Sequence, residues 1–387
     1  MSTRPRILVI SLSPLISDAR VLRQLSVVAE HGHVTSIGYG PAPDMVDEHI
    51  EIPRNMASLP QTPWGVIKLA LRAHRHSELA APAIRYGLEQ LRERKFDLVV
   101  ANDARVLAFA HQVANGAPVW ADMHEWAPEE RTHVLAWRLL VAPLMTYLCR
   151  IYLPRSAAVT TVGARIAQLY RQHFGVDAQV MRNSSPWQDL KPSPGPDDDA
   201  QRIRLVHSGA AIHGRNLEAM IDVVTDLGER YTLDLYLMPG GDDGKYLAAL
   251  RSRAVGCDRI RFCDPVAPGD LPATLNGYDV GVFWIPPTHT NARLTLPNKF
   301  FDFVQARLAV AVGPSVEMAD LVRHYGLGVV SEGFTVEECR RSILDLTPGA
   351  IRDAKRASDA ASKELSFEHD AGVADQILEG ALSSSVE

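Results

Sequence analysis

Residues 6–38, RILVISLSPLISDARVLRQLSVVAEHGHVTSIG, decide the fold class. Arg6–Ser11 is a short apolar run with β-branched residues, which is typical of a buried strand. In Asp18–Glu30 the apolar residues recur at helical spacing, and His31-Gly32 ends the helix. Val34–Gly38 is predicted to be the next strand. A strand, a helix and a second strand in this order form a β-α-β unit, which indicates a parallel sheet.

The same alternation continues along the first half of the chain. Strand patterns recur at Phe96–Ala101, Val119–Asp122, Ala157–Val162 and Ala178–Met181, and helical patterns lie between them at Ser77–Arg94, Val106–Ala114 and Ile166–Phe174. Residues 191–200, KPSPGPDDDA, are too rich in proline, glycine and aspartate to build a core. The alternation then restarts at Arg204–Ser208. We therefore expect a domain boundary at this stretch.

The expected architecture is α/β, with two doubly wound, Rossmann-like parallel-sheet domains facing across a cleft. The domains are expected at residues 1–190 and 203–360, joined by a linker at 191–202. A helical tail, residues 361–387, is expected to cross back and pack on the N-terminal domain. Ligands of such sheets bind beyond the carboxyl ends of the strands, so functional residues are to be sought there.

Composition excludes several classes of protein. The chain has 387 residues and a net charge of −6, whereas a nucleic-acid-binding protein normally shows a basic balance. The four cysteines lack the short spacing of zinc or redox motifs, which suits a reducing compartment. The N-terminus has no apolar signal-peptide region. Charged residues and a proline interrupt the apolar stretch Leu135–Leu153, so it does not resemble a transmembrane helix. These features predict a cytoplasmic protein.

A basic and apolar stretch leaves contact with the inner face of a membrane open. Residues 64–76, WGVIKLALRAHRH, would place Lys68, Arg72 and Arg75 on one face of a helix. That face could touch an anionic membrane or a lipid-linked acceptor. A solvated helix face is the simpler interpretation.

The strongest local signal is Asn291–Val310, NARLTLPNKFFDFVQARLAV. Pro297 suits the first turn of a helix, whose N–H groups favour an anion. A lysine in that turn, Lys299, is favourable if a phosphate lies nearby. Asp302 lies three residues further on, on the same side of the helix, and a carboxylate can accept hydrogen bonds from two ribose hydroxyls. The alternative is an ordinary amphipathic helix with an exposed Lys/Asp pair.

A second signal lies between a strand and a helix, at Ser208–Asn216, SGAAIHGRN. Gly209 and Gly214 permit close approach of the backbone to a ligand. Arg215 at the helix start is well placed for a pyrophosphate, although a surface arginine on a loop is the alternative.

In the N-terminal half, residues 121–130, ADMHEWAPEE, follow a strand end. His124 there could polarise or deprotonate an acceptor hydroxyl, with Glu125 positioning it, although a structural histidine is equally consistent. Asp103 is a weaker acceptor-side candidate. Asp18 is either a helix N-cap or catalytic, and Arg20 is expected to face the cleft. No histidines pair at zinc-ligand spacing within a helix, so no bound catalytic metal is expected.

These motifs resemble those of retaining GT-B glycosyltransferases of the family 4-like group. P-N-K-F-F-D-F-V-x-A-x-L-A-V is similar to their P-N-K-L-F-E-Y-x-A-x-G-x-P-V signature. S-D-A-R-V-L-R-Q-L and D-x-H-E-x-x-P-E are similar to their first helix and an N-domain loop. The resemblance implies that Asp302 replaces the glutamate that holds the donor ribose. Leu294 stands where many relatives have a second glutamate.

The resemblance also assigns the other donor-side residues. Asn298 and Lys299 would lie at the pyrophosphate, and Arg215 would neutralise the leaving diphosphate. Pro239-Gly240-Gly241 is similar to a glycine turn near the nucleotide, and Asp264 replaces a glycine of the segment that meets the base. The implied donor set is Gly209, Gly214, Arg215, Gly240, Asp264, Asn291, Asn298, Lys299 and Asp302.

We therefore expect a glycosyltransferase that moves a sugar from a nucleotide-diphosphate sugar to an acceptor hydroxyl, with retention and without a metal. No cofactor is expected beyond a UDP-, GDP- or dTDP-sugar co-substrate. The acceptor is a glycan, a lipid-linked molecule or a small molecule. The alternatives are a GT-B sugar-nucleotide epimerase or hydrolase, and a non-catalytic nucleotide-sugar-binding protein. A dehydrogenase is disfavoured because neither half shows G-x-G-x-x-G after its first strand.

Overall fold

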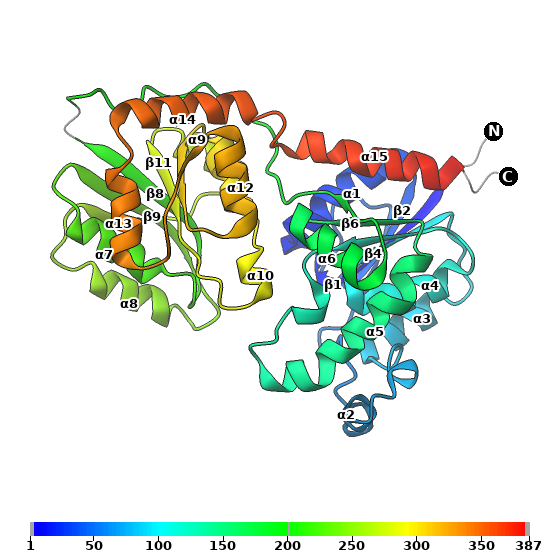
Figure 1. The fold of residues 1–387 in the computed structure, drawn as a ribbon. Helices are drawn as coiled ribbons and strands as arrows, with labels where there is room; N and C mark the ends of the chain where they lie inside the picture. Colours follow the sequence, from blue (N-terminus) through cyan, green and yellow to red (C-terminus); the bar gives the residue numbers. More distant parts are fainter. Residues whose placement is uncertain (1–3, 200–201, 384–387) are drawn as a thin grey trace. The chain divides into compact units, whose positions relative to one another are not determined.

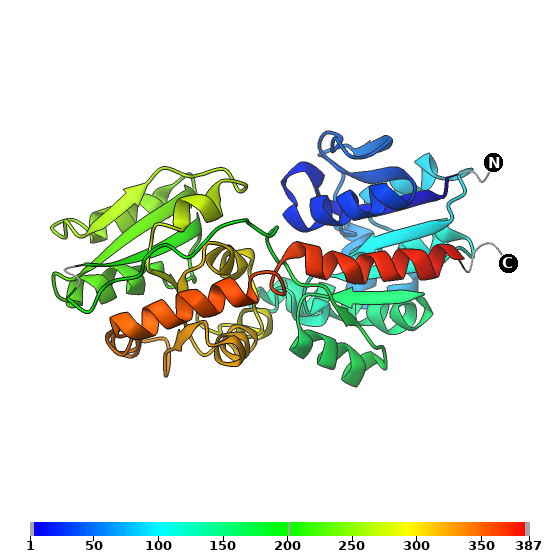
Figure 2. The ribbon, with the colours of Figure 1, turned by 90° about the horizontal axis from the view of Figure 1, so that it is seen from above.

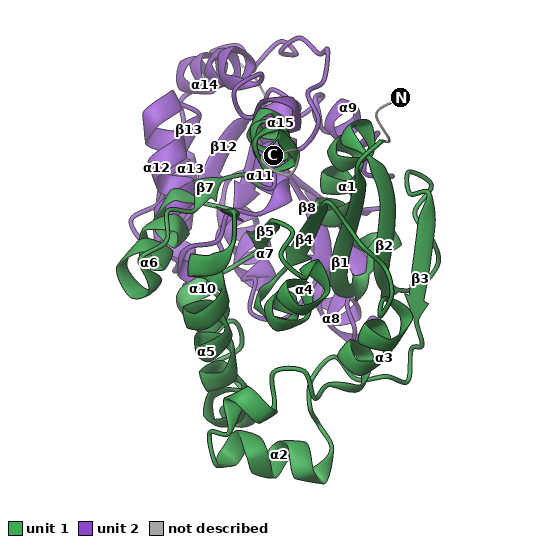
Figure 3. Cartoon of the chain, turned by 90° about the vertical axis from the view of Figure 1, so that its right-hand side faces the viewer, with its two compact units in different colours: residues 1–182, 289–291, 370–387 green, residues 183–288, 292–369 purple. Residues whose placement is uncertain are grey.

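The computed structural model describes residues 4–199 and 202–383, which form two compact units. Unit 1 comprises residues up to 182 together with 289–291 and 370 onward, and unit 2 comprises 183–288 and 292–369 (Figure 3). The division therefore falls after Arg182, and the proline-rich stretch predicted to be a linker belongs to unit 2. Residues 200–201 of that stretch lie outside the described part of the chain.

Unit 1 is built on a seven-stranded sheet in the order β3-β2-β1-β4-β5-β6-β7, and all its strand pairs are parallel (Figure 1). The strands are β1 Arg6–Pro14, β2 His33–Tyr39, β3 Glu48–Ile52, β4 Leu98–Asn102, β5 Val119–Met123, β6 Ala158–Thr161 and β7 Gln179–Val180. The helices are α1 Ala19–His31, α2 Pro63–Ala70, α3 Pro82–Gln90, α4 Leu107–Ala114, α5 Ala142–Tyr152, α6 Ala164–Phe174 and α15 Phe367–Ser383. Residues of α15 from 370 onward belong to this unit, and the helix runs along it in Figure 2.

Unit 2 is built on a six-stranded parallel sheet in the order β10-β9-β8-β11-β12-β13. Its strands are β8 Ile203–Ala211, β9 Tyr231–Pro239, β10 Ile260–Cys263, β11 Val280–Phe283, β12 Ala309–Val312 and β13 Gly328–Val330. Its helices include α7 Leu217–Asp226, α8 Lys245–Arg253, α9 Leu271–Leu275, α11 Asn298–Gln305, α12 Val316–Tyr325, α13 Val336–Leu344 and α14 Pro348–Ala361. The short α10, Thr290–Arg293, includes two residues of unit 1.

Both sheets share one strand order, in which the first strand lies between the second and the fourth. This is the order of dinucleotide-binding folds, and it creates a topological switch point between the first and the fourth strand of each sheet. In unit 1 the switch point lies between β1 and β4, and in unit 2 between β8 and β11. The predicted class, two doubly wound α/β units, is confirmed. The strand order also indicates that a ligand is favoured at the switch point of each unit.

Local sequence explains why the central elements form. The middle of β1, from Ile7 to Ile10, is fully buried, as a strand covered on both faces should be. The carboxylate of Asp18 accepts a hydrogen bond from the Val21 N–H and so caps α1. Of the two roles considered for Asp18, this is the N-cap. In unit 2, a side chain at Gly281 would collide with the ring of Phe303, so this glycine lets α11 pack closely on β11.

Several elements differ from the sequence prediction. Strands β3 and β13 and helices α8 and α12 were not predicted, and α3 occupies only the centre of the helix predicted at Ser77–Arg94. The predicted basic helix face was wrong. Helix α2 ends at Ala70, and Arg72 takes a left-handed φ of 59° and donates a hydrogen bond to the Leu139 carbonyl. Lys68, Arg72 and Arg75 therefore do not share one helical face.

Candidate functional site

The switch point of unit 2 brings together a buried lysine and a histidine. Lys299 lies in the first turn of α11 and is only 8% exposed. Pro297 is the N-cap of this helix and not its first residue, because its ψ of 157° is extended. The Lys299 Nζ lies 3.3 Å from Nε2 of His207 on β8 and 4.6 Å from the centre of the Phe283 ring. The sequence therefore placed Lys299 correctly in the first turn but did not reveal its burial.

His207 is neutral in this arrangement. Its Nδ1 lies 2.8 Å from the Val282 carbonyl oxygen, which can only accept, so Nδ1 carries the proton. Nε2 is then the acceptor for the Lys299 ammonium. Burial, and next the charge of Lys299, hold the pKa of His207 well below its ordinary value. Sequence analysis missed His207, whose only signal is a polar residue inside the apolar strand RLVHS.

Arg215 is the second cation of this region. It lies half-buried just before α7, whose N-cap is Asn216. Burial lowers the pKa of Arg215. Burial, and next the charge of Arg215, lower the pKa of Lys299 to about 7, whereas Asp302 acts in the opposite direction. Two cations that repel each other in a buried setting form a site to which an anion would bind favourably.

Gly209 is required beside Lys299. A side chain there would lie 2.7 Å from Nζ of Lys299, and its φ of 133° disfavours other residues. The neighbouring hydroxyl of Ser208 is buried and has no hydrogen-bond partner among the described residues. This end of β8 therefore carries a glycine against which the Lys299 side chain packs, and next to it a buried hydroxyl without a partner among the described residues.

Asp302 lies one turn further along α11 and accepts a hydrogen bond from the hydroxyl of Ser185. Ser185 is buried and comes from the segment that opens unit 2, so sequence spacing could not link it to Asp302. Asn298, the first residue of α11, is exposed. Asp302 thus stands near enough to Lys299 to raise its pKa, and its carboxylate is held by Ser185.

The remaining predicted donor residues lie at other strand ends. Gly214 precedes Arg215 with a φ of 82°, and Gly240 follows β9, where a side chain would collide with the Ala211 carbonyl. Asp264 follows β10 and is exposed. Asn291 is different, because it belongs to unit 1, where its side chain bonds the backbone N–H and carbonyl of Trp126. Its amide is thus committed to holding a loop.

In unit 1 a buried polar network lies at the ends of β4 and β5. Asp122 is fully buried and binds the Arg20 guanidinium through two hydrogen bonds of 2.9 and 2.5 Å. Gln24 and Thr160 donate to the same carboxylate. His124 Nε2 lies 3.0 Å from the side-chain oxygen of Asn102 and 3.6 Å from Asp122. Arg20 therefore serves this network and is only 7% exposed, although it was expected to face the cleft.

The network holds His124 in its charged form. Its Nδ1 faces the carboxylate of Asp103 at 3.6 Å. Burial alone would lower the pKa of His124, but Asp103 and Asp122 outweigh it and raise the pKa to about 9. Burial likewise opposes ionisation of Asp122, yet Arg20 and His124 hold its pKa far below the ordinary value. At neutral pH His124 is therefore a hydrogen-bond donor and a positive charge, not a free base.

Glu125, in contrast to the charged His124, favours its uncharged form at neutral pH. Burial, followed by the charges of Asp103 and Glu130, raises the pKa of Glu125 to about 8. Asp103 itself adopts a φ of 72°, which is uncommon for a residue other than glycine and frequent at functional sites. These three residues, Asp103, His124 and Glu125, follow directly after the two central strands β4 and β5. The sequence predicted them, but Asp122, Asn102 and Gln24 were missed.

A cavity of about 630 Å³ lies at the carboxyl ends of β1, β2 and β3. Its lining is mainly apolar, with one cation, Arg54, and it includes Ile16, Tyr39, Met56 and Gln61. This volume is in the range of small-molecule sites, and carboxyl strand ends are where such sites occur. This cavity was not predicted from the sequence, because its residues come from three separate loops.

Among the residues that the structure describes, no group of three or more histidines, cysteines or acidic residues is placed to hold a metal ion. Over the same part of the chain, no helix is both long and apolar enough to cross a membrane.

The comparisons with known proteins agree with this geometry. Residues 28–183 match the model of Glycosyltransferase Family 4. The match covers 156 of the 387 residues and lies within unit 1, up to the start of unit 2. A search of curated protein sequences found no match. With the two Rossmann-like units, the match makes the chain a glycosyltransferase of the GT-B type, as the sequence motifs predicted.

Solved structures share the fold over nearly the whole chain. Alr3699/HepE from Anabaena, in complex with UDP and glucose, is 14% identical with a TM-score of 0.68, covering 97% of this chain and 100% of its own. Sucrose-phosphate synthase from Thermosynechococcus elongatus is 12% identical with a TM-score of 0.68, covering 98% and 100%. WaaG, a glycosyltransferase involved in lipopolysaccharide biosynthesis, is 13% identical with a TM-score of 0.63, covering 96% and 99%.

Proposed function

We propose that this chain transfers a sugar from a nucleoside-diphosphate sugar bound by unit 2 to a hydroxyl group of an acceptor bound by unit 1. The observation that carries the proposal is the pair of cations, Lys299 and Arg215, at the switch point of unit 2. Their mutual repulsion is relieved when a diphosphate binds between them and the backbone at Gly209. The HepE structures with UDP and with UDP-glucose favour a uridine donor as the first to test.

The same cations suit the chemical step. Negative charge develops on the diphosphate as the bond to the sugar breaks, and fixed positive groups stabilise it. Lys299 and Arg215 would supply this charge, as a metal ion does in metal-dependent transferases, which supports a metal-independent reaction. Asp302, held by Ser185, would accept hydrogen bonds from the donor ribose. Retention of the anomeric configuration is proposed on the motif resemblance.

On the acceptor side, the charged form of His124 favours polarisation of a hydroxyl over its deprotonation. The carboxyl of Glu125, with a pKa of about 8, exchanges protons near the working pH and suits acid–base chemistry. The cavity that contains Arg54 would hold the rest of the acceptor. Its lining suits a glycan, a lipid-linked molecule or a small molecule with an anionic group.

Thermal unfolding in the presence of UDP, GDP, dTDP and ADP tests the donor site. We expect one diphosphate to raise the melting temperature, because it binds only the native chain. Arg215→Ala should remove most of this shift and cut transfer at least a hundredfold. Arg323→Ala, which changes an exposed arginine of the same unit, is the matched control. Equal shifts in wild type and Arg215→Ala would refute the assignment of Arg215.

The reaction products separate this proposal from its alternatives. A hydrolase or epimerase would convert the donor sugar at full rate without any acceptor, and a binding protein would show a thermal shift with no turnover. A transferase should release the diphosphate faster when a competent acceptor is added.

Diphosphate binding should also weaken as pH rises from 7 to 9. Lys299, with a pKa of about 7, loses its proton over this range in the free protein, and a bound diphosphate favours the charged form. The β-phosphate is already ionised at pH 7, since its pKa is about 6. Binding therefore takes up a proton and weakens by at most about tenfold per pH unit. Calorimetry in buffers of different ionisation enthalpy measures the uptake directly. Binding without proton uptake would contradict this role of Lys299.

A further inference from the structure

One face of unit 1 exposes apolar side chains from two separate segments, Gln61–His76 and Arg131–Val141, here called the α2 face. Trp64 and Leu71 are 73% and 75% exposed, and Leu135 and Leu139 are 58% and 51% exposed. Val66, Ile67 and Val134 add smaller exposed areas. Contiguous apolar patches of this kind mark interaction surfaces.

The two segments form one surface. Helix α2 packs against the helical turn Trp137–Val141, and Figures 1 and 3 show α2 beside the start of the helical run that continues into α5. The Arg72 guanidinium donates a hydrogen bond to the Leu139 carbonyl and so ties the segments together. Between them lies a cavity of about 290 Å³, lined by Val66, Val134 and Trp137 among others. Leu69 and Trp137 form the buried side of the packing.

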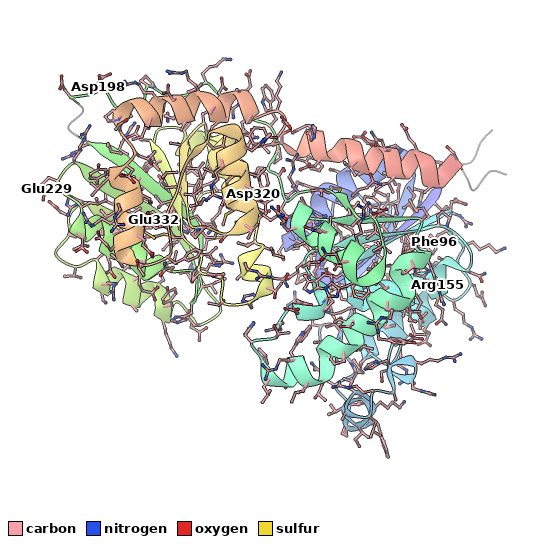
Figure 4. All side chains as sticks on the ribbon, viewed as in Figure 1. Phe96, Arg155, Asp198, Glu229, Asp320 and Glu332 are labelled. Atoms are coloured by element: carbon pink, nitrogen blue, oxygen red, sulfur yellow. The ribbon has the colours of Figure 1, made fainter. Side chains whose placement is uncertain are left out.

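The charge of the α2 face is opposite to that of the whole chain. The segments contain Lys68, Arg72, Arg75, Arg131 and Arg138 and no aspartate or glutamate, in a chain with a net charge of −6. The carboxylates that precede the second segment are engaged elsewhere, since Glu129 accepts from Thr290 and Glu130 pairs with Arg105. The basic character continues into α5, which contains Arg150 and no aspartate or glutamate. Arg155, labelled in Figure 4, follows the far end of that helix.

We infer that the α2 face docks on the surface of an anionic lipid bilayer. Protruding leucines and a tryptophan would enter the interfacial layer, and the surrounding arginines and lysine would contact anionic headgroups. An acidic protein partner would satisfy the charges, but protruding side chains on two short helical segments, with cations around them, suit a fluid interface better. Docking would also place the loop at Leu59–Gln61, which borders both this groove and the Arg54 cavity, close to the bilayer.

Vesicle co-sedimentation of the full chain tests this inference. We expect binding to phosphatidylcholine vesicles that contain phosphatidylglycerol, weaker binding to pure phosphatidylcholine, and release by salt. Trp64→Ser/Leu71→Ser should weaken binding at least tenfold. Arg75→Gln/Arg138→Gln should weaken binding to the anionic vesicles by roughly fivefold per cation removed.

Matched controls lie in unit 2. Val255→Ser changes a side chain that is 81% exposed, and Lys245→Gln/Arg323→Gln changes two exposed cations. These variants should bind vesicles like wild type. All variants should keep the wild-type melting temperature and the nucleotide-induced shift, so a failure of the donor-site proposal remains distinguishable. The inference is overturned if wild type ignores anionic vesicles, or if α2-face and control variants bind equally.

Discussion

Lys299→Met is expected to make the unliganded protein more stable and, at the same time, unable to bind its nucleotide. The two effects have opposite signs because, in the proposed donor site, Lys299 binds the ligand but destabilises the empty fold. Its Nζ is buried beside Arg215, and burial with that neighbouring charge brings its pKa from 10.5 to about 7. A methionine fills a similar volume without a charge, so the buried repulsion disappears.

The direction of the pH dependence follows from the same pKa. Between pH 7 and 10.5 the unfolded chain binds a proton at Lys299 that the folded chain has largely lost, so stability rises with pH. The contribution is on the order of a few kcal/mol at neutral pH, at about 1.4 kcal/mol per pKa unit. In Lys299→Met this part of the pH dependence is absent. The gain in stability should therefore be large at pH 7 and nearly vanish at pH 10.

Melting temperatures at pH 7 and pH 10, each with and without the diphosphate that stabilises wild type, measure both effects. Lys245→Met is the control, since Lys245 is an exposed lysine in the first turn of α8 in the same unit. It should change neither stability nor the nucleotide shift. A Lys299→Met protein that melts lower than wild type at pH 7 would show that the lysine stabilises the empty fold. A variant that still responds to nucleotide would remove Lys299 from the donor site.

The sequence was sufficient for the parts of this molecule that depend on local pattern. Apolar runs with helical segments between them predicted the two parallel sheets, and the motif around Lys299 and Asp302 predicted the start of α11. Arg215 and His124 were found for the same reason, since each follows a strand within a short motif. Elements with weak patterns were missed. Strand β3, EHIEI, has two glutamates and a histidine among five residues, and α8 has two arginines and a lysine among nine.

What the sequence could not reveal depends on contacts between distant segments. Ser185 and Asp302 are 117 positions apart, and Arg20 and Asp122 are 102 apart. Arg72 was predicted to share a helical face with Lys68 and Arg75, yet α2 ends before it and its guanidinium bonds the carbonyl of Leu139, from another segment. Burial and neighbouring charges together also decide the protonation states. The usual order of lysine and histidine is reversed here. The pKa of Lys299 is about 7 and that of His124 is about 9, so His124 holds its proton to higher pH than Lys299.

Asp122→Asn is expected to destabilise unit 1 by about 3–5 kcal/mol, because it removes one partner of a buried ion pair. Asp122 is fully buried and Arg20 is only 7% exposed, so the guanidinium would keep its charge but lose the carboxylate of Asp122 that it pairs with. The asparagine would also offer one acceptor oxygen where Arg20, Gln24 and Thr160 now share two. Peptide-resolved hydrogen exchange over β4 and β5 measures the loss in unit 1 separately from unit 2. Asp177→Asn, which breaks an exposed pair with Arg171 in the same unit, should leave exchange unchanged.

The same substitution should change how stability depends on pH. The pKa of His124 is about 9 when folded against an ordinary 6.5, so its contribution is complete below pH 6.5 and is lost as pH rises through 9. Without the Asp122 charge the folded pKa of His124 falls, and this decline should shift to lower pH. The NMR titration of the His124 ring then gives a direct readout. An unchanged titration in Asp122→Asn would mean that Asp103 alone holds the charge, and the role of Asp122 would reduce to its bond with Arg20. A shifted titration would make Asp122 the residue that keeps His124 a hydrogen-bond donor at the acceptor side.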